Sequence, residues 1–171
     1  PASGDDGTSE GAAQYIVSQI NQNSNNKKIN TCFLGFENSK DEINLYVKYI
    51  NNKNINIIQP YSRFKYLAKK IFENKVVAVF NGKSEFGPRA LGARSIIANP
   101  TDPKIKEILN EKVKLREPFR PFAPICLEEE IKNYFDLNVE SNFMLFICDT
   151  LQDKKDLIPG VVHEDGTARV Q

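Results

Sequence analysis

The sequence predicts an α/β domain, because short apolar segments typical of buried strands alternate with segments of helical periodicity. The expected strands are 55–58, 76–80, 95–99, 121–127 and 143–148. The expected helices cover 8–21, 40–51, 60–71, 102–113 and 128–135. Interleaved strands and helices favour an open, twisted α/β sheet. The length of 171 residues suits about one domain with a real core.

Two helices are predicted near the amino terminus from spacing and start signals. The first presents an apolar face made by Ala12, Ala13, Ile16, Val17 and Ile20. The second follows the capping-box pattern of Ser39 and Glu42, and places Ile43, Val47 and Ile50 on one face. Both helices are therefore expected to pack through one side.

Two further helices begin at prolines, which are favoured at the first helical position. Pro60 starts a helix with a buried side made by Phe64, Leu67, Ala68 and Ile71. Asp102-Pro103 starts another, in which Ile105, Leu109 and Val113 face inward. Between these helices, "VVAVF" at 76–80 is a β-rich segment bounded by polar residues, as buried strands are.

Composition limits the classes of partner. A net charge of +1 gives no general attraction to nucleic acid or membranes, although 81–125 holds nine basic against five acidic residues, a balance of +4. Cys32, Cys126 and Cys148 lie far apart without metal-ligand spacing, as expected of reduced core thiols in a cytoplasmic protein. The sequence contains neither an apolar run of membrane-spanning length nor a signal-like amino terminus, so we expect no membrane association.

The domain boundary is predicted in the polar, Asn-rich stretch 21–30. Residues 1–26 are then a leading fragment, and 27–171 form the main domain. Because the chain lacks an initiator methionine and closes on "GTARVQ", we expect it to be a piece of something longer.

The segment 82–95, "GKSEFGPRALGARS", is a candidate anion site. It places Lys83, Arg89 and Arg94 on a stiff frame of glycine and proline directly after a strand. Such loops present backbone N–H groups to anions, and arginine adds a planar fork that matches phosphate oxygens. The segment matches neither the P-loop nor the dinucleotide pattern. From these residues alone, a structural turn with its arginines paired to Glu85 is equally well supported.

Two further loops carry arginine. "KLREPFRPFAP" at 114–124 contains Arg116 and, between two prolines, Arg120; the alternative interpretation is a rim loop with solvated charges. In "VVHEDGTARVQ", Asp165-Gly166 predicts a turn before Arg169, and His163 favours a structural over a catalytic role. We expect the arginine loops to converge around a polyphosphate and a second anion. Without a nucleophile–base pair, chemistry there would work by positioning and charge stabilisation.

Three long motifs resemble the carboxy-terminal part of the O-carbamoyltransferases of the NodU/CmcH type: "GKSEFGPRALGARSIIANP", "LNEKVKLREPFRPFAP" and "HEDGTARVQ". The opening "GDDGTSEGAA" is similar to the end of that family's actin-like transfer domain. The resemblance implies a YrdC-like α/β domain that binds ATP and carbamoyl phosphate and forms carbamoyl adenylate. The actin-like domain would then pass the carbamoyl group to the hydroxyl of a small-molecule acceptor, such as a sugar or antibiotic.

The resemblance also implies roles for single residues. Arg89 and Arg120 would be catalytic and bind carbamoyl phosphate, with help from Lys83, which lacks the fork of the more usual arginine. ATP, with Mg²⁺, would be bound by Arg169, Arg94 and Arg116. Asp5 would be an iron ligand, completed by histidines outside this sequence. On this interpretation, the chain alone binds the donor substrates weakly and cannot carbamoylate an acceptor.

Two alternatives remain open at the level of sequence. One is a non-catalytic RNA-binding module of YrdC type, although base-stacking aromatic residues are not interleaved regularly with the basic ones. The other is a threonylcarbamoyl-adenylate synthase, which would use threonine and bicarbonate. The "FGPRALG" and "FRPFAP" segments resemble the carbamoyltransferases more closely than the synthases. Because a balance of +4 over 45 residues is only a modest basic patch, we do not expect nucleic acid as a partner.

Overall fold

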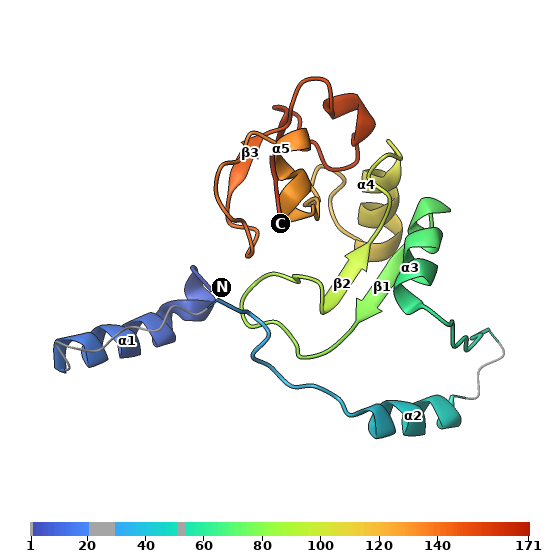
Figure 1. Ribbon diagram of the computed structural model, residues 1–171, viewed down its shortest axis with the longest axis horizontal. Coiled ribbons are helices and arrows are strands. Elements are labelled where there is room, and N and C mark those ends of the chain that lie inside the picture. Colours follow the sequence, from blue (N-terminus) through green and yellow to red (C-terminus); the bar gives the residue numbers. More distant parts are fainter. Residues whose placement is uncertain (1, 21–29, 51–53) are drawn as a thin grey trace. The chain divides into compact units, whose positions relative to one another are not determined.

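The computed structural model describes residues 2–20, 30–50 and 54–171 as a mixture of helices and small sheets (Figure 1). The helices are α1 Thr8–Ile20, α2 Lys40–Tyr49, α3 Arg63–Phe72, α4 Ile105–Ile108 and α5 Ile131–Tyr134. Single-turn helical elements are η1 Asp5–Gly7, η3 Glu128–Glu130 and η4 Lys155–Leu157, and a π-helix, η2, covers Leu109–Lys114. The strands are β1 Val77–Phe80, β2 Arg94–Ile97, β3 Ile147–Asp149 and β4 Thr167–Arg169. The α/β class is confirmed.

The chain divides into two compact units. Unit 1 consists of Pro1–Ile58 and Val79–Ser95, and unit 2 consists of Gln59–Ala78 and Ile96–Gln171. β1 pairs with β2 in one two-stranded sheet, and β3 pairs with β4 in a second. The described strands therefore form two small sheets rather than the single open sheet that was expected.

In unit 1, the segment 32–36 is hydrogen-bonded to the start of the glycine-rich loop. Gly35 N donates to Ser84 O over 3.0 Å, Ser84 N donates to Phe36 O over 3.0 Å, and Phe86 N donates to Cys32 O. A side chain on Gly35 would collide with Ser84, so the close approach requires glycine. This pairing anchors one end of the loop that carries Arg89.

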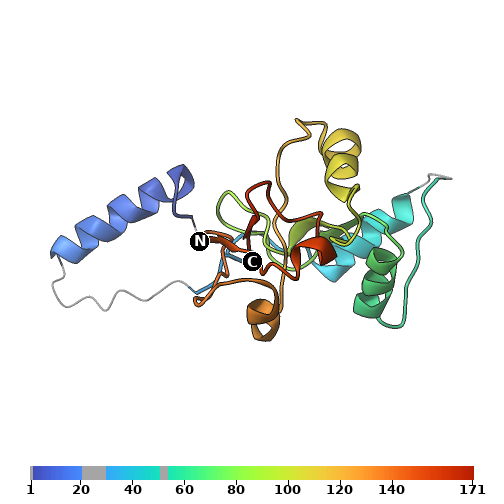
Figure 2. The same cartoon turned by 90° about the horizontal axis from the view of Figure 1, so that it is seen from above.

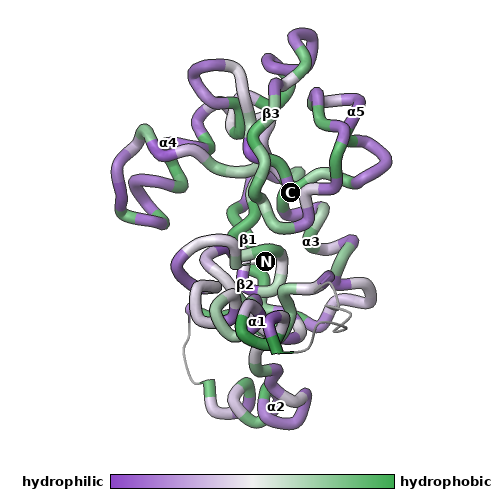
Figure 3. Tube along the Cα trace, turned by 90° about the vertical axis from the view of Figure 1, so that its left-hand side faces the viewer, coloured by the Kyte–Doolittle hydropathy of each residue, from purple (hydrophilic) through white to green (hydrophobic). Residues whose placement is uncertain are grey.

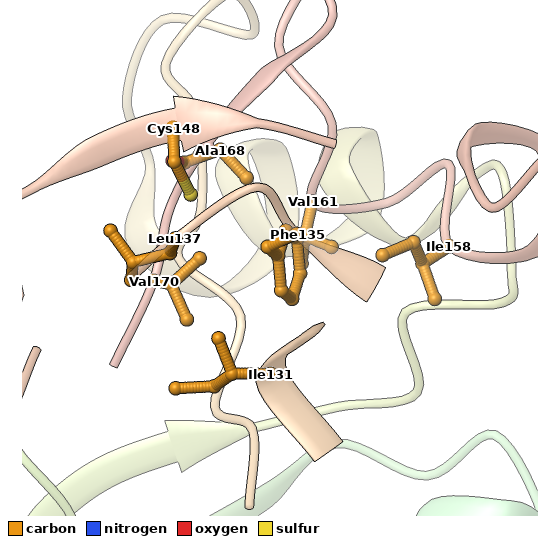
Figure 4. Close-up of a cluster of buried hydrophobic side chains, with 8 residues drawn as sticks. All are labelled: Ile131, Phe135, Leu137, Cys148, Ile158, Val161, Ala168 and Val170. Atoms are coloured by element: carbon orange, nitrogen blue, oxygen red, sulfur yellow. The ribbon is translucent and has the colours of Figure 1, made fainter. Parts of the chain in front are cut away.

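In unit 2, a core of eight buried side chains holds the β3–β4 sheet against α5. They are Ile131, Phe135, Leu137, Cys148, Ile158, Val161, Ala168 and Val170 (Figure 4). The antiparallel register pairs Cys148 with Ala168 and Ile147 with Arg169. Because side chains alternate across a strand, Ala168 enters the core while Arg169 lies on the opposite face of β4.

The strand predictions are confirmed in part. β1 and β2 form where 76–80 and 95–99 were expected, but 55–58 forms no strand. The segment 121–127 forms no strand, and Pro121 and Pro124 have no N–H to donate to a neighbouring strand. From 143–148 only the end pairs, because Met144 has a left-handed φ of 56° in a turn closed by Ser141 O. Figure 3 shows the apolar residues that run along β3.

A helix forms near each of the five expected positions, but α3 begins at Arg63 and α4 at Ile105, so neither begins at the proline that was predicted to start it. Burial also differs from the prediction. Within the described residues α1 and α2 bury no side chain, and Ile20 is 74% exposed. Phe64 on α3 and Val113 on η2 are also exposed, whereas Ile105 and Leu109 are buried as predicted. Helical spacing predicts where a helix forms, but burying its apolar face also requires a partner surface.

The predicted linker at 21–30 lies almost entirely outside the described residues. In the described part of the chain, no helix has the length and apolar character needed to cross a bilayer.

Candidate functional site: two arginine loops

The loop 82–95 in unit 1 is organised by one carboxylate. Glu85 Oε1 accepts hydrogen bonds from the backbone N–H groups of Leu91, at 2.8 Å, Ala93, at 2.7 Å, and Arg94, at 3.1 Å. Gly92, with φ of 111°, supplies a conformation that L side chains rarely adopt. The returning half of the loop is thus folded around Glu85, with Arg89 at the turn.

The same hydrogen bonds keep Glu85 ionised. Burial by itself would raise the pKa of this carboxyl group, but the combined backbone N–H bonds from Leu91, Ala93 and Arg94 and from Glu85 itself lower it below its usual value. The described structure shows no ion pair between Glu85 and Arg89 or Arg94. The alternative in which Glu85 pairs with the arginine side chains is therefore wrong, since it binds the backbone instead.

Arg94 closes the base of this loop. Its Nη1 donates to Asn81 O, at 3.0 Å, and its Nη2 to Gly82 O, at 3.1 Å. The guanidinium carbon lies 3.6 Å from the centre of the Phe80 ring. These contacts give Arg94 a structural role, and its expected contact with ATP stays a prediction.

Lys83 and Arg89 are exposed on the loop. In the part of the chain that the structure describes, no acidic group forms an ion pair with either of them. Their charges therefore remain available to an anion from solution.

The second loop, 115–120 in unit 2, is organised by Asn110. This residue is 0% exposed and lies in the π-helix η2, which continues α4 without a break in the yellow coil of Figure 2. Its Nδ2 donates to Pro118 O, at 3.1 Å, and to Arg120 O, at 2.9 Å. π-helical turns often occur at functional sites, and here the turn places a buried amide beneath the arginine loop.

Arg116 is held by the other end of the same amide. Its Nε donates to Asn110 Oδ1 over 2.7 Å, and its guanidinium lies 4.8 Å from the centre of the Phe122 ring. Leu115, immediately before it, adopts a left-handed φ of 48° that turns the chain out of the helix. Side chain and backbone thus fix the position of Arg116.

Arg120 is exposed and paired within the loop. Its Nε lies 3.0 Å from Glu117 Oε2, and both side chains are more than half exposed. Exposed pairs of this kind contribute little to stability. A dianion could therefore compete with Glu117 for the guanidinium.

The carboxy-terminal segment forms the predicted turn. Asp165 Oδ1 accepts from Thr167 N, at 3.0 Å, and from Thr167 Oγ1, at 2.7 Å. His163 Nδ1 lies 3.0 Å from Thr167 Oγ1, and His163 N donates to Thr167 O. The structural role favoured for His163 agrees with these contacts. Arg169 follows on β4 and is half-buried.

A hollow of about 420 Å³ in unit 2 is lined mainly by the residues around α5. Its charged lining is Glu128, Glu129, Glu140 and Lys132, and none of the six candidate cationic residues lines it. An acidic lining repels phosphate, so the arginine loops are the better candidates for an anion site.

The six expected cationic residues are divided between the units. Lys83, Arg89 and Arg94 lie in unit 1, and Arg116, Arg120 and Arg169 lie in unit 2. Their convergence around one ligand stays a prediction.

Asp5 was expected to take part in an iron site. Asp5 is exposed in η1, and the described residues contain no group of three His, Cys, Asp or Glu side chains able to share a metal ion. The expected histidine ligands lie outside this sequence, so Asp5 as an iron ligand stays a prediction.

Sequence reasoning missed Asn110 as the organiser of the second loop. The available signal was a polar residue directly after the inward-facing Leu109, within "LNEKVKLRE". Glu85 was noticed only as a possible arginine partner, because hydrogen bonds from the backbone leave no residue-type signature.

Comparison with known proteins identifies the family. The model of the carbamoyltransferase C-terminus matches residues 68–171. Nodulation protein U of Rhizobium tropici is 50% identical over 105 residues, which cover 61% of this chain and 18% of that protein. The chain is also 36% identical over its whole length to the protein MJ1058 of Methanocaldococcus jannaschii, of which it covers 29%.

A third relative extends the match to another nodulation protein. NolNO of Sinorhizobium fredii is 34% identical over 174 residues, which cover all of this chain and 26% of that protein. The chain thus spans less than a third of the length of these relatives. Because the family model covers more than half of the chain and includes both arginine loops, the chain belongs to the carbamoyltransferase family and corresponds to its carboxy-terminal part.

Proposed function

We propose that this chain is the donor-activating part of an O-carbamoyltransferase, which binds carbamoyl phosphate and ATP and forms carbamoyl adenylate. Its carbamoyl group is then passed to the hydroxyl of a small-molecule acceptor. In this proposal the main domain is YrdC-like, and α1 is the end of an actin-like transfer domain. The supporting observation is that arginines on two stiffened loops lie within the region that matches the family model.

The reaction needs positive charge more than acid–base groups. Carbamoyl phosphate, ATP and water give carbamoyl adenylate, phosphate and pyrophosphate. Water cleaves carbamoyl phosphate into carbamate and phosphate. An oxygen of the carbamate then bonds to the α-phosphorus of ATP, and pyrophosphate leaves. Both released groups are multiply charged anions, so preorganised guanidinium groups that meet the developing charge lower the barrier. Mg²⁺, bound to the ATP phosphates, would supply further charge.

The chain offers residues for each part of this task. Arg89 and Arg120 bind the phosphate of carbamoyl phosphate, with Lys83 nearby as a point charge. Arg169, Arg116 and Arg94 face the nucleotide. For Arg120, binding requires release from Glu117, which is 3.0 Å away and exposed. Arg89 forms no ion pair with another described residue, so no such pair has to break before it binds the phosphate.

The test is exchange of labelled pyrophosphate into ATP that depends on carbamoyl phosphate, measured with the intact protein. Replacing Arg89 or Arg120 by alanine should lower the exchange rate by about 30- to 1,000-fold, since loss of one charge-stabilising donor typically costs about 2–4 kcal/mol. Arg63→Ala is the matched control, because Arg63 is exposed on α3 and is not among the assigned residues.

Equal exchange rates in wild type, Arg89→Ala and Arg120→Ala would remove the assigned roles. Exchange that requires threonine and bicarbonate instead of carbamoyl phosphate would identify a threonylcarbamoyl-adenylate synthase. Salt-dependent RNA binding without ATP binding would favour the RNA-binding alternative.

A further inference from the structure

We propose that Arg116 is a preoriented oxyanion-binding residue and that Asn110 is the positioning residue that aims it. The geometry assigns a phosphate-type anion to the two terminal nitrogens of Arg116. The assignment rests on the proposed function only for the identity of that anion, which we take to be a phosphate group of ATP or the departing pyrophosphate.

The first step is the role of Asn110. A fully buried amide must satisfy its hydrogen-bonding groups, and Asn110 does so with one acceptor and two donor contacts inside the loop it supports. The Asn110 side chain itself is not exposed to solvent. The amide is therefore a rigid link between the π-helix and the arginine loop.

The second step is the geometry of the guanidinium. Asn110 takes the Nε edge of Arg116, and the Phe122 ring lies against its face. Within the described residues, the two terminal nitrogens have no hydrogen-bond partner and no carboxylate forms an ion pair with the group. The edge formed by these two nitrogens is the one that binds an oxyanion in a bidentate manner.

The third step is a comparison with the neighbouring arginines. Arg94 already donates from both terminal nitrogens to carbonyl oxygens of its own loop. Arg120 is exposed and its Nε is paired with Glu117, so this pair must break before the same edge of the guanidinium can bind a ligand. Arg116 is half-buried, fixed on one edge and open on another, so it loses little side-chain entropy on binding.

The experiment is calorimetric titration of the intact protein with inorganic pyrophosphate and with ATP. Arg116→Ala should weaken pyrophosphate binding by about 10- to 100-fold, as expected for loss of a bidentate charged contact. Arg116→Lys should recover only a small part of this loss, because lysine keeps the charge but has neither Nε nor the fork.

The control is Arg63→Ala. Arg63 also lies over an aromatic ring, at 4.7 Å from the centre of Phe64, but it is exposed, and no side-chain amide among the described residues forms a hydrogen bond that fixes it. Its removal should leave pyrophosphate affinity unchanged. Phe122→Leu, which keeps an apolar side chain but removes the ring face, should weaken binding by about two- to tenfold.

The positioning role of Asn110 is tested by a measurement that does not depend on ligand affinity. In protein labelled at arginine, the Nε–H of Arg116 should exchange slowly with solvent in the wild type and at least tenfold faster in Asn110→Ser. Pyrophosphate affinity should fall in that variant while the charge is unchanged. If Asn110→Ser does not fold, Phe122→Leu and Arg116→Lys still test the fixed geometry.

Wild-type pyrophosphate affinity in Arg116→Ala, or equal affinity in Arg116→Lys and wild type, would overturn the inference, as would a wild-type protein that does not bind pyrophosphate. The proposed function fails differently. If carbamoyl phosphate drives no pyrophosphate exchange but Arg116→Ala still loses pyrophosphate binding, the reaction is wrong and the site stands. If exchange occurs and Arg116→Ala binds normally, the site is wrong and the reaction stands.

Discussion

The loop of Arg89 and the loop of Arg116 and Arg120 are stiffened in opposite ways. In the first, an ionised carboxylate, Glu85, gathers backbone N–H groups. In the second, a neutral amide, Asn110, gathers backbone carbonyl groups and also holds a guanidinium. A carboxylate can only accept, whereas an amide accepts and donates. The hydrogen bonds that organise the first loop therefore depend on the ionisation of a carboxylate, whereas those that Asn110 makes in the second loop do not.

Of the substitutions that test this difference between the loops, Asn110→Ala should have the largest effect on stability. The substitution removes three hydrogen bonds and leaves a space beside buried groups, so the free energy of unfolding should fall by about 2–4 kcal/mol. Urea unfolding of both proteins measures the difference. Asn133→Ala is the control, because Asn133 is exposed and bonds only to Glu130 among the described residues, and it should change stability by less than about 0.5 kcal/mol. Similar losses in the two variants would contradict the role of Asn110.

A smaller effect is expected from Glu85→Gln, which keeps the shape and an acceptor oxygen but removes the charge. At neutral pH the free energy of unfolding should fall by about 1–2 kcal/mol, since hydrogen bonds to a charged acceptor are the stronger kind. The pKa of Glu85 is lowered in the folded protein from an ordinary value of 4.5. Its contribution is therefore fully present above about pH 4.5 and is lost as the pH falls through the lower folded value.

Urea unfolding of the two proteins from pH 7 to pH 3 tests this sign. The difference between wild type and Glu85→Gln should shrink below about pH 4.5, whereas the difference between wild type and Asn110→Ala should stay constant. Comparing differences removes the contributions of other carboxyl groups with lowered pKa, such as Asp165. A pH-independent gap for Glu85→Gln would show that Glu85 does not act as a charged acceptor.

The smallest change in stability is expected from Glu117→Gln. The exposed pair with Arg120 should contribute no more than about 0.2–1 kcal/mol. Its removal frees Arg120, so the affinity for carbamoyl phosphate should rise about two- to fivefold in calorimetric titration at low salt, with the gain lost at high salt. Glu73→Gln, which removes the ion pairs of Glu73 with Lys69 and Lys70 on α3, is the control. Unchanged or weaker binding in Glu117→Gln would argue against Arg120 as a ligand of this dianion.

The positions of the helices and the arginine motifs could be predicted from the amino-acid sequence alone. Ser39 and Glu42 form the expected capping box at the start of α2, and the spacing of Ile105 and Leu109 predicted their burial. The motifs around Arg89 and Arg120 indicated the family before any coordinates. These features are local, because capping bonds and helical periodicity involve residues no more than a few positions apart.

The pairing of apolar segments, the burial of helix faces and the polar residues that organise the loops became clear only from the three-dimensional fold. The segment 121–127 has the apolar character of a strand, but its prolines and the available partner limit it to two hydrogen bonds with Gln171. Asn110 bonds to residues six to ten positions away, and Glu85 bonds to backbone groups that every residue possesses. Such contacts depend on how the chain returns on itself in space, which residue type and periodicity do not encode.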